Sequence, residues 1–226
     1  MRKWIRNNRG LIAFLLTFGL FRTAVADWNP VPSGSMRPTI QEGDVVLVDR
    51  LAYNLKVPLT NIVLAHTGEP ARGDIVTFHS PIDGVRLLKR LVAVPGDRVE
   101  MRDKVLLIND RPATYALLGT AVEHAPDGSA VDARLLAETA DGRTHVVQWL
   151  RPAGSSAWDS FGPLVIPAGH YLMLGDNRDN SADSRAFGLV PRELLIGSTH
   201  RILVSADIKG NWAPRAERFG KKLDAP

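Results

Sequence analysis

The chain has 226 residues, 45% of them hydrophobic, which is enough for one large domain with a buried core. It has no cysteine, which excludes a disulfide framework, a thiolate nucleophile and a cysteine zinc site. Residues 1–10 contain four of the 28 basic residues and no acidic residue. The other 24 basic residues balance the 24 acidic residues, so the charge distribution predicts no nucleic-acid surface.

The N-terminal segment, residues 1–28, allows two interpretations. The apolar stretch Leu11–Phe21 has the length of a signal-peptide core, and Ala24–Ala26 resembles an A-x-A cleavage site. Alternatively, Trp4–Trp28 is a short membrane anchor whose arginines reach the interfaces. The local pattern favours the signal peptide, and both interpretations place the basic N-terminus in the cytoplasm.

Beyond residue 30 the pattern is typical of β-strands separated by turns rich in Gly, Pro and Asp. No long amphipathic helix is expected there, and Pro191–Leu195 could form one short helical turn. The sequence therefore predicts a mainly β protein. The predicted strands are Asp44–Val48, Asp74–Phe78, Val85–Val94, Arg98–Ile108, His145–Leu150, Tyr171–Leu174 and His200–Val204.

Residues 109–166 differ from their surroundings, because they lack regular strand spacing and are rich in Ala, Gly and Asp. We interpret them as a smaller subdomain inserted between two parts, 29–108 and 167–208, of one β core. The final segment, 209–226, is a basic tail with two aromatic residues, which is either solvated or in contact with a membrane surface.

Two serines, Ser33 and Ser35, flank Gly34 in a segment stiffened by Pro32 and Pro38. Such a loop can present one hydroxyl as a nucleophile and the other as an oxyanion donor, although most clusters of this kind are plain turns. The six histidines lie in no recognisable triad or metal-binding pattern, and we interpret them as surface or turn residues.

Lys89 is the candidate base for a serine nucleophile. Strand alternation places it in an apolar row with Leu87 and Leu91, whereas Arg86 and Arg90 fall on the other face. A lysine with an ordinary pKa of about 10.4 is neutral in only about one molecule in 2,500 at pH 7. Lowering that pKa to about 7 needs roughly 4–5 kcal/mol, which burial in an apolar pocket can supply. The alternative is a snorkelling or edge-strand lysine.

A third unusual stretch is Gly175–Arg185, which is crowded with Asp, Asn and Arg around Ser181. It fits no calcium loop, because Ser184 stands at the glycine position and Val190 at the closing glutamate. A network of Asp183 and Arg185 beside Ser181 could orient a catalytic lysine.

Taken together, these stretches resemble the motifs of bacterial type I signal peptidases, the leader peptidases. The resemblance covers about residues 10–110 and 165–205. The matching stretches, in the family's order, are Pro32–Thr39, Gly43–Asp44, Arg72–Val76, Lys89–Asp97 and Gly175–Arg185.

The resemblance implies a serine endopeptidase with a serine–lysine dyad and no cofactor or metal. Ser35 would be the nucleophile and Lys89 the general base. The Ser33 hydroxyl and the Ser35 backbone N–H would form the oxyanion hole. Ser181 would orient the Lys89 amine, and Asp183 and Arg185 would form a supporting salt bridge.

The resemblance also implies two antiparallel β-sheets, an inserted subdomain and one N-terminal transmembrane helix. The partners would be membrane lipid and the signal peptides of exported preproteins, cut after small residues, with no nucleic acid. The enzyme would be a monomer on the outer face of the bacterial inner membrane. The resemblance favours a retained anchor over cleavage near Ala26. Two alternatives stay open: a specialised maturation protease for a pilin-like or conjugative-transfer protein, and a non-catalytic secreted β-domain that binds a partner.

Overall fold

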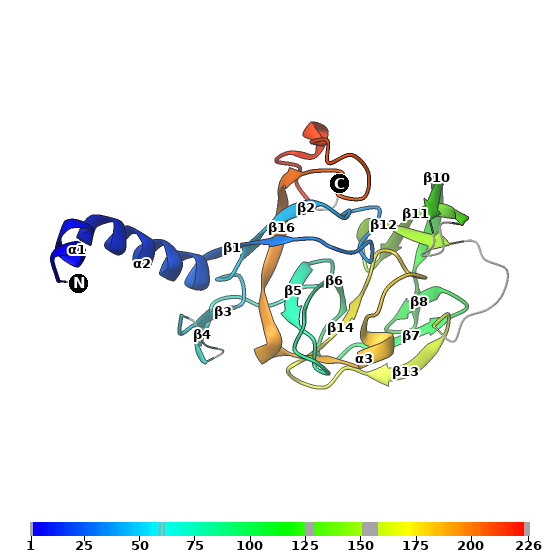
Figure 1. The fold of residues 1–226 in the computed structure, drawn as a ribbon. Coiled ribbons are helices and arrows are strands. Elements are labelled where there is room, and N and C mark those ends of the chain that lie inside the picture. Colours follow the sequence, from blue (N-terminus) through cyan, green and yellow to red (C-terminus); the bar gives the residue numbers. More distant parts are fainter. Residues whose placement is uncertain (1, 59, 61, 125–128, 151–157, 224–226) are drawn as a thin grey trace.

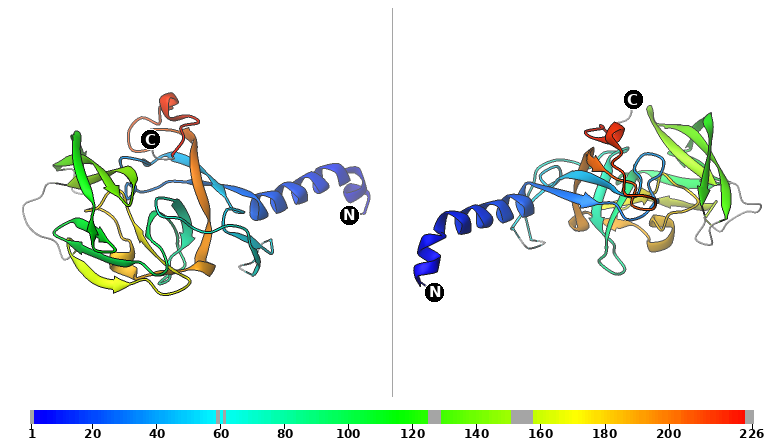
Figure 2. Two further views of the ribbon diagram at one scale, coloured as in Figure 1. Left: turned by 180° about the vertical axis from the view of Figure 1, so that it is seen from behind. Right: turned by 45° about the horizontal axis from the view of Figure 1, so that its top comes forward.

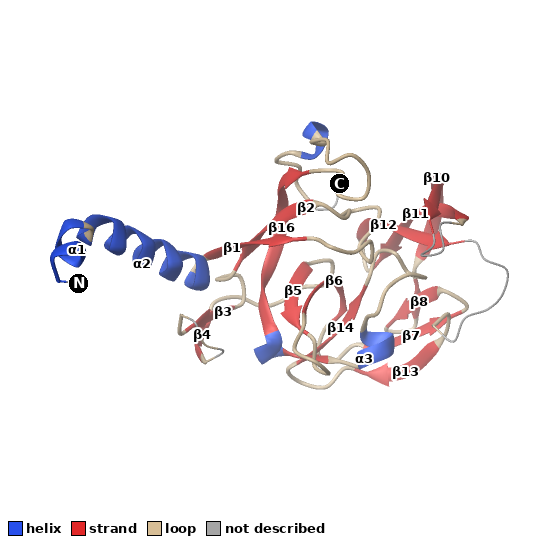
Figure 3. Ribbon diagram, viewed as in Figure 1, coloured by secondary structure: helices blue, strands red, loops and turns tan. Residues whose placement is uncertain are grey.

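The computed structural model describes residues 2–58, 60, 62–124, 129–150 and 158–223 (Figure 1). Parts of the predicted insertion, 125–128 and 151–157, and the last three residues of the predicted tail lie outside these ranges. Strands dominate the rest, so the prediction of a mainly β protein is confirmed (Figure 3).

Two helices precede the β body and project away from it (Figure 1). They are α1 (Arg2–Asn7) and α2 (Arg9–Ala24), and they differ from the one continuous anchor expected over Trp4–Trp28. The 16 residues of α2 extend for about 24 Å, whereas a bilayer's hydrocarbon core is about 30 Å thick. In the described part of the chain, none of the helices combines the length and the apolar character needed to cross a membrane.

The largest sheet contains seven strands, and all neighbouring pairs in it are antiparallel. Strand β6 (Arg86–Ala93) lies near its centre, between β5 (Ile75–His79) and β14 (His170–Leu174). Six of the eight residues of β6 are buried, because both of its faces are covered. In spatial order the strands are β1 (Ala26–Pro30), β2 (Asp44–Asp49), β16 (Leu195–Ser205), β5 (Ile75–His79), β6 (Arg86–Ala93), β14 (His170–Leu174) and β15 (Val190–Pro191).

Two smaller sheets extend this core. One is the hairpin β3 (Asn54–Lys56) and β4 (Val63–His66), and the other has the order β13 (Phe161–Val165), β7 (Arg98–Arg102), β8 (Val105–Ile108) and β9 (Arg111–Pro112). The sequence predicted one strand over Arg98–Ile108, but the chain reverses at Asp103 and Lys104, which both have positive φ, 48° and 71°.

The predicted insertion contributes a three-stranded antiparallel sheet of β10 (Thr114–His124), β11 (Ala130–Ala140) and β12 (Arg143–Leu150). The strand predicted over His145–Leu150 is confirmed as part of β12, whereas the expectation that residues 109–166 lack regular strand spacing is wrong. Small Ala and Gly residues weaken the alternation of large apolar and polar side chains that identifies a strand. This sheet, which we call the inserted sheet, lies at the end of the molecule opposite α2 (Figures 1 and 2). The described residues thus form four sheets rather than two.

Three short helical turns complete the described elements: α3 (Ser184–Phe187), η1 (Arg192–Leu194) and η2 (Ala216–Arg218). The turn η1 lies within the predicted Pro191–Leu195. The segment after residue 208 packs back on the core, where the Arg218 guanidinium donates to the buried Asp44 carboxylate at 2.9 and 2.6 Å. Leu223 joins the core cluster that contains Val46, Leu88 and Ile202.

Candidate active site

Ser35 lies in a loop whose neighbouring side chains are anchored in the core. Val31, Met36 and Ile40 are all buried in one apolar cluster under the first part of the seven-stranded sheet. The Arg37 N–H donates to the Gly34 carbonyl at 3.1 Å, which tightens the turn around the serine. The loop therefore holds the Ser35 hydroxyl on a short, well-supported segment.

Lys89 projects from the middle of β6 and is only 3% exposed. Its Nζ lies 2.5 Å from the Oγ of Ser35, although the two residues are 54 positions apart in the chain. Leu91, on the same face of β6, belongs to the apolar cluster that also contains Val76 and Met173. Strand alternation therefore predicted the apolar surroundings of this amine correctly.

Burial lowers the pKa of Lys89 from 10.5 to about 8, and the nearby Asp183 and Asp176 carboxylates only partly oppose this effect. At pH 7 about one amine in eleven is then neutral, compared with about one in 3,000 for an unperturbed lysine. A neutral amine at hydrogen-bond distance can accept the hydroxyl proton of Ser35, so this pair has the geometry and the electrostatics of a nucleophile and its base.

The segment from Gly175 to Arg185, which we call the 175–185 loop, packs against the Ser35 loop. The Asn177 backbone N–H donates to the Ser35 carbonyl at 3.1 Å, and the Asn177 side-chain amide donates to the Gly34 carbonyl at 3.1 Å. Two hydrogen bonds from one residue thus fix the two peptide bonds that flank the Cα of Ser35. The sequence analysis did not single out Asn177.

Asp183 and Arg185 form a bidentate ion pair within this loop, at 2.8 and 2.7 Å. The Asp183 carboxylate also accepts the Gly175 N–H at 3.0 Å, and the Arg185 guanidinium donates to the Arg178 carbonyl at 2.6 Å. The pair therefore braces both ends of the loop beside the lysine.

Ser181 lies close to Gly175. A Cβ atom added to Gly175 would collide with the Ser181 hydroxyl and would lie 2.5 Å from the Ser35 carbonyl oxygen. Among the described residues, the buried Ser181 hydroxyl has no hydrogen-bond partner. The structure thus contains no hydrogen bond between Ser181 and Lys89. The hydroxyl remains available in the wall of the site.

The two predicted oxyanion donors are in different environments. Within the described part of the chain, no group accepts a hydrogen bond from the Ser35 backbone N–H. Ser33 is exposed, and none of the residues that the structure describes forms a hydrogen bond with its hydroxyl. Both groups can therefore still donate to a bound carbonyl.

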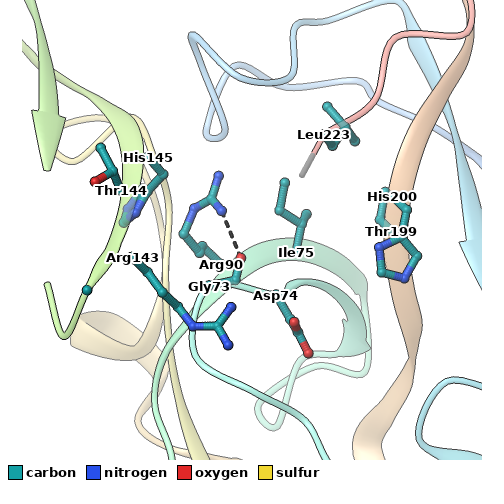
Figure 4. A pocket seen from close by; sticks show the side chains of 11 residues that line it. Gly73, Asp74, Ile75, Arg90, Arg143, Thr144, His145, Thr199, His200 and Leu223 are labelled. Carbon is teal, nitrogen blue, oxygen red and sulfur yellow. Dashed lines mark hydrogen bonds between the residues drawn. The ribbon is translucent and has the colours of Figure 1, made fainter. Parts of the chain in front are cut away.

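The sequence analysis missed a buried polar pair beside the dyad. Arg90 follows Lys89 in β6, and its guanidinium donates to both oxygens of the Asp176 carboxylate at 2.8 and 2.7 Å. It also donates to the Gly73 carbonyl, as Figure 4 shows. The Thr39 hydroxyl donates to Asp176 at 2.6 Å, which links β6, the Ser35 loop and the 175–185 loop. The face of β6 opposite Lys89 is thus covered as well.

The interpretation of all six histidines as surface or turn residues is wrong for His145. Its side chain is only 10% exposed, comes from β12 and lines the same pocket as Arg90 (Figure 4). Burial lowers its pKa to about 4, with Arg90 acting in the same direction, so the ring is neutral at physiological pH. In the described ranges, no cluster of three or more His, Asp or Glu side chains is arranged to hold a metal ion.

A serine hydroxyl in contact with a buried lysine amine, on a β-sheet scaffold, defines the class of serine hydrolases that use a Ser–Lys pair. Residues 1–204 match the model of the family described as signal peptidase, peptidase S26. The chain belongs to this family.

Two relatives of known sequence agree with this assignment. A signal peptidase I of Pseudomonas fluorescens is 34% identical over 214 residues, which are 89% of this chain and 73% of that protein. One of Rickettsia typhi is 33% identical over 222 residues, which are 91% of this chain and 83% of that protein. A crystal structure of a signal peptidase I from Enterococcus faecalis V583 covers 57% of this chain and 96% of its own, at 30% identity and a TM-score of 0.36.

Proposed function

We propose that this chain is a serine endopeptidase that removes signal peptides from exported preproteins, cutting after small residues at A-x-A sites. Ser35 is the nucleophile and Lys89 the general base. The observation that carries the proposal is the 2.5 Å approach of an almost completely buried amine to a serine hydroxyl. Family membership supports the same substrate class.

In the proposed reaction, neutral Lys89 takes the Ser35 proton while Oγ attacks the carbonyl carbon of the scissile peptide bond. The Ser35 N–H and the Ser33 hydroxyl stabilise the resulting oxyanion. The Lys89 ammonium then gives its proton to the departing amine of the mature protein, which leaves an acyl-enzyme ester on Ser35. Water, deprotonated by Lys89, hydrolyses this ester and releases the signal peptide with a free carboxylate.

Three further residues are proposed to hold the base in position. Ser181 orients the Lys89 amine, and this role is supported by its buried hydroxyl, which has no hydrogen-bond partner among the described residues. Asp183 and Arg185 brace the loop that carries Ser181.

We also propose that α2 holds the enzyme on the inner membrane, with a cytoplasmic N-terminus and the β body on the outer side. Six large apolar side chains of α2 are exposed, and the basic flank precedes them. These side chains are Leu11, Phe14, Leu15, Leu16, Phe18 and Phe21. One copy of the chain supplies both members of the dyad, which supports a monomeric enzyme.

Preprotein cleavage in detergent tests the proposal with a matched pair of lysine variants. Lys56 is also buried, but its Nζ donates to the Glu193 and Leu195 carbonyls at 3.0 and 2.8 Å and does not contact Ser35. Ser35→Ala and Lys89→Met should lose about 10³-fold or more in kcat/KM with the fold retained by circular dichroism, whereas Lys56→Met should keep near wild-type cleavage. Wild-type cleavage by either Ser35→Ala or Lys89→Met would eliminate the proposal.

A further inference from the structure

The inserted sheet contacts the 175–185 loop through a buried ion pair. Glu138 of β11 has no exposed surface and Arg178 is 3% exposed. The Arg178 guanidinium donates to both Glu138 oxygens, each at 2.6 Å. The Tyr115 hydroxyl of β10 donates to the same carboxylate at 2.7 Å. Glu138 thus holds one arginine of the loop, and Tyr115 on the neighbouring strand holds the Glu138 carboxylate.

The same sheet also binds the backbone of the loop. The Gln148 N–H of β12 donates to the Asp176 carbonyl at 2.8 Å, and the Arg178 N–H donates to the Gln148 carbonyl at 3.0 Å. These bonds form a parallel bridge between Gln148 and Asn177. Residues 176–178 therefore continue the inserted sheet as a very short fourth strand.

The residue at the centre of this segment faces the nucleophile. Asn177 is bonded through its backbone N–H to the Ser35 carbonyl and through its side chain to the Gly34 carbonyl, both at 3.1 Å. Its neighbour Arg178 is the residue held by Glu138. The inserted sheet and the Ser35 backbone are thus joined through two adjacent residues.

We propose that Glu138 is a positioning residue, which sets the location of Ser35 by holding Arg178 and with it Asn177. The inserted sheet is then a part of the catalytic framework. This inference rests on the proposed role of Ser35. A buried ion pair seldom adds net stability compared with an apolar pair of the same volume, because both charges must be desolvated. A role in fixing the register of the loop would explain why this ion pair is buried, whereas a contribution to stability would not.

The first variant is Glu138→Gln, which keeps the shape of the side chain and removes its charge. We expect kcat to fall about 10- to 100-fold and KM to stay within about twofold, since a misplacement of about 1 Å costs about 100-fold. The pH midpoint of kcat/KM should not move, because Lys89 keeps its surroundings. In hydrogen–deuterium exchange, the Asn177 and Arg178 amides should lose protection.

Two further variants separate positioning from stability. Thr139 follows Glu138 on β11, and its hydroxyl forms a hydrogen bond of 2.8 Å with that of Thr144 on β12. Thr139→Val removes this hydrogen bond, which does not involve the loop, and should leave kcat unchanged. The double variant Glu138→Leu/Arg178→Met removes both charges, so it should fold at least as stably as the wild type. It should nevertheless show the same fall in kcat as Glu138→Gln.

The possible outcomes distinguish a failure of this inference from a failure of the proposed function on which it rests. A double variant that folds and keeps the wild-type kcat would overturn the positioning role while leaving Ser35 as the nucleophile. A Glu138→Gln enzyme that loses only preprotein affinity, and cleaves short peptides normally, would do the same and make the inserted sheet a binding surface. If wild-type protein cleaved nothing, the proposed function would fail, whereas the exchange measurement would still test the link from Glu138 to Asn177.

Discussion

The rate of preprotein cleavage is expected to follow the charge of Lys89 as the pH is raised. Because burial lowers the Lys89 pKa to about 8, about one amine in 100 is neutral at pH 6, one in eleven at pH 7 and half at pH 8. If only the neutral amine acts as the base, kcat/KM rises about ninefold from pH 6 to 7 and about tenfold in total from pH 7 to 9. It then levels off.

The assay is the initial rate of cleavage of one purified preprotein in detergent, at substrate concentrations well below KM, from pH 6 to 10. Under these conditions kcat/KM reports the ionisation of the free enzyme. A lysine with an ordinary pKa of about 10.4 would give about 100-fold from pH 7 to 9 without a plateau. Such a rise, or a rate that does not change from pH 6 upward, would refute the proposed state of Lys89.

Three other results are expected. Lys89→Met should raise the free energy of unfolding at pH 7 by up to about 3 kcal/mol in urea titrations, since the fall of the pKa from 10.5 to about 8 is the cost of keeping the ammonium buried. This gain should shrink as the pH rises from 8 to 10.5. In this range the unfolded chain binds more protons than the folded chain, so the free energy of unfolding of the wild type rises with pH. A gain that stays constant would contradict this reasoning. Gly175→Ala should lose most cleavage activity, because its Cβ would lie 2.5 Å from the Ser35 carbonyl oxygen, whereas Gly119→Ala, with open space around it, should be active. Intact mass spectrometry of the purified membrane form should show a retained N-terminal segment, and a mature N-terminus at Asp27 would disprove the anchor.

The residues that lie in short motifs could be predicted from the sequence. Ser35, Lys89 and the Asp183–Arg185 pair stand in stretches whose local composition is unusual, and the alternation along β6 indicated an apolar setting for the lysine. These signals are local, because strand geometry and a two-residue ion pair depend on neighbours in the chain.

The contacts that join distant segments could not be predicted in this way. Arg90 and Asp176 are 86 residues apart, and Glu138 and Arg178 are 40 apart. Each pair forms only when the 175–185 loop packs against a strand from a distant part of the chain, and neither periodicity nor turn residues encode that contact. A charged residue such as Glu138 within a strand that is otherwise rich in small and apolar residues was the available signal for a buried partner.

The state of the Lys89 amine can be measured directly by NMR of the chain labelled with ¹³C at lysine Cε, with the Lys89 signal assigned by its disappearance in Lys89→Met. We predict a titration midpoint near pH 8, well below the ordinary lysine value of about 10.4. A Lys89 signal with a midpoint near that ordinary value would contradict the account, because almost every Lys89 amine would then be charged at neutral pH.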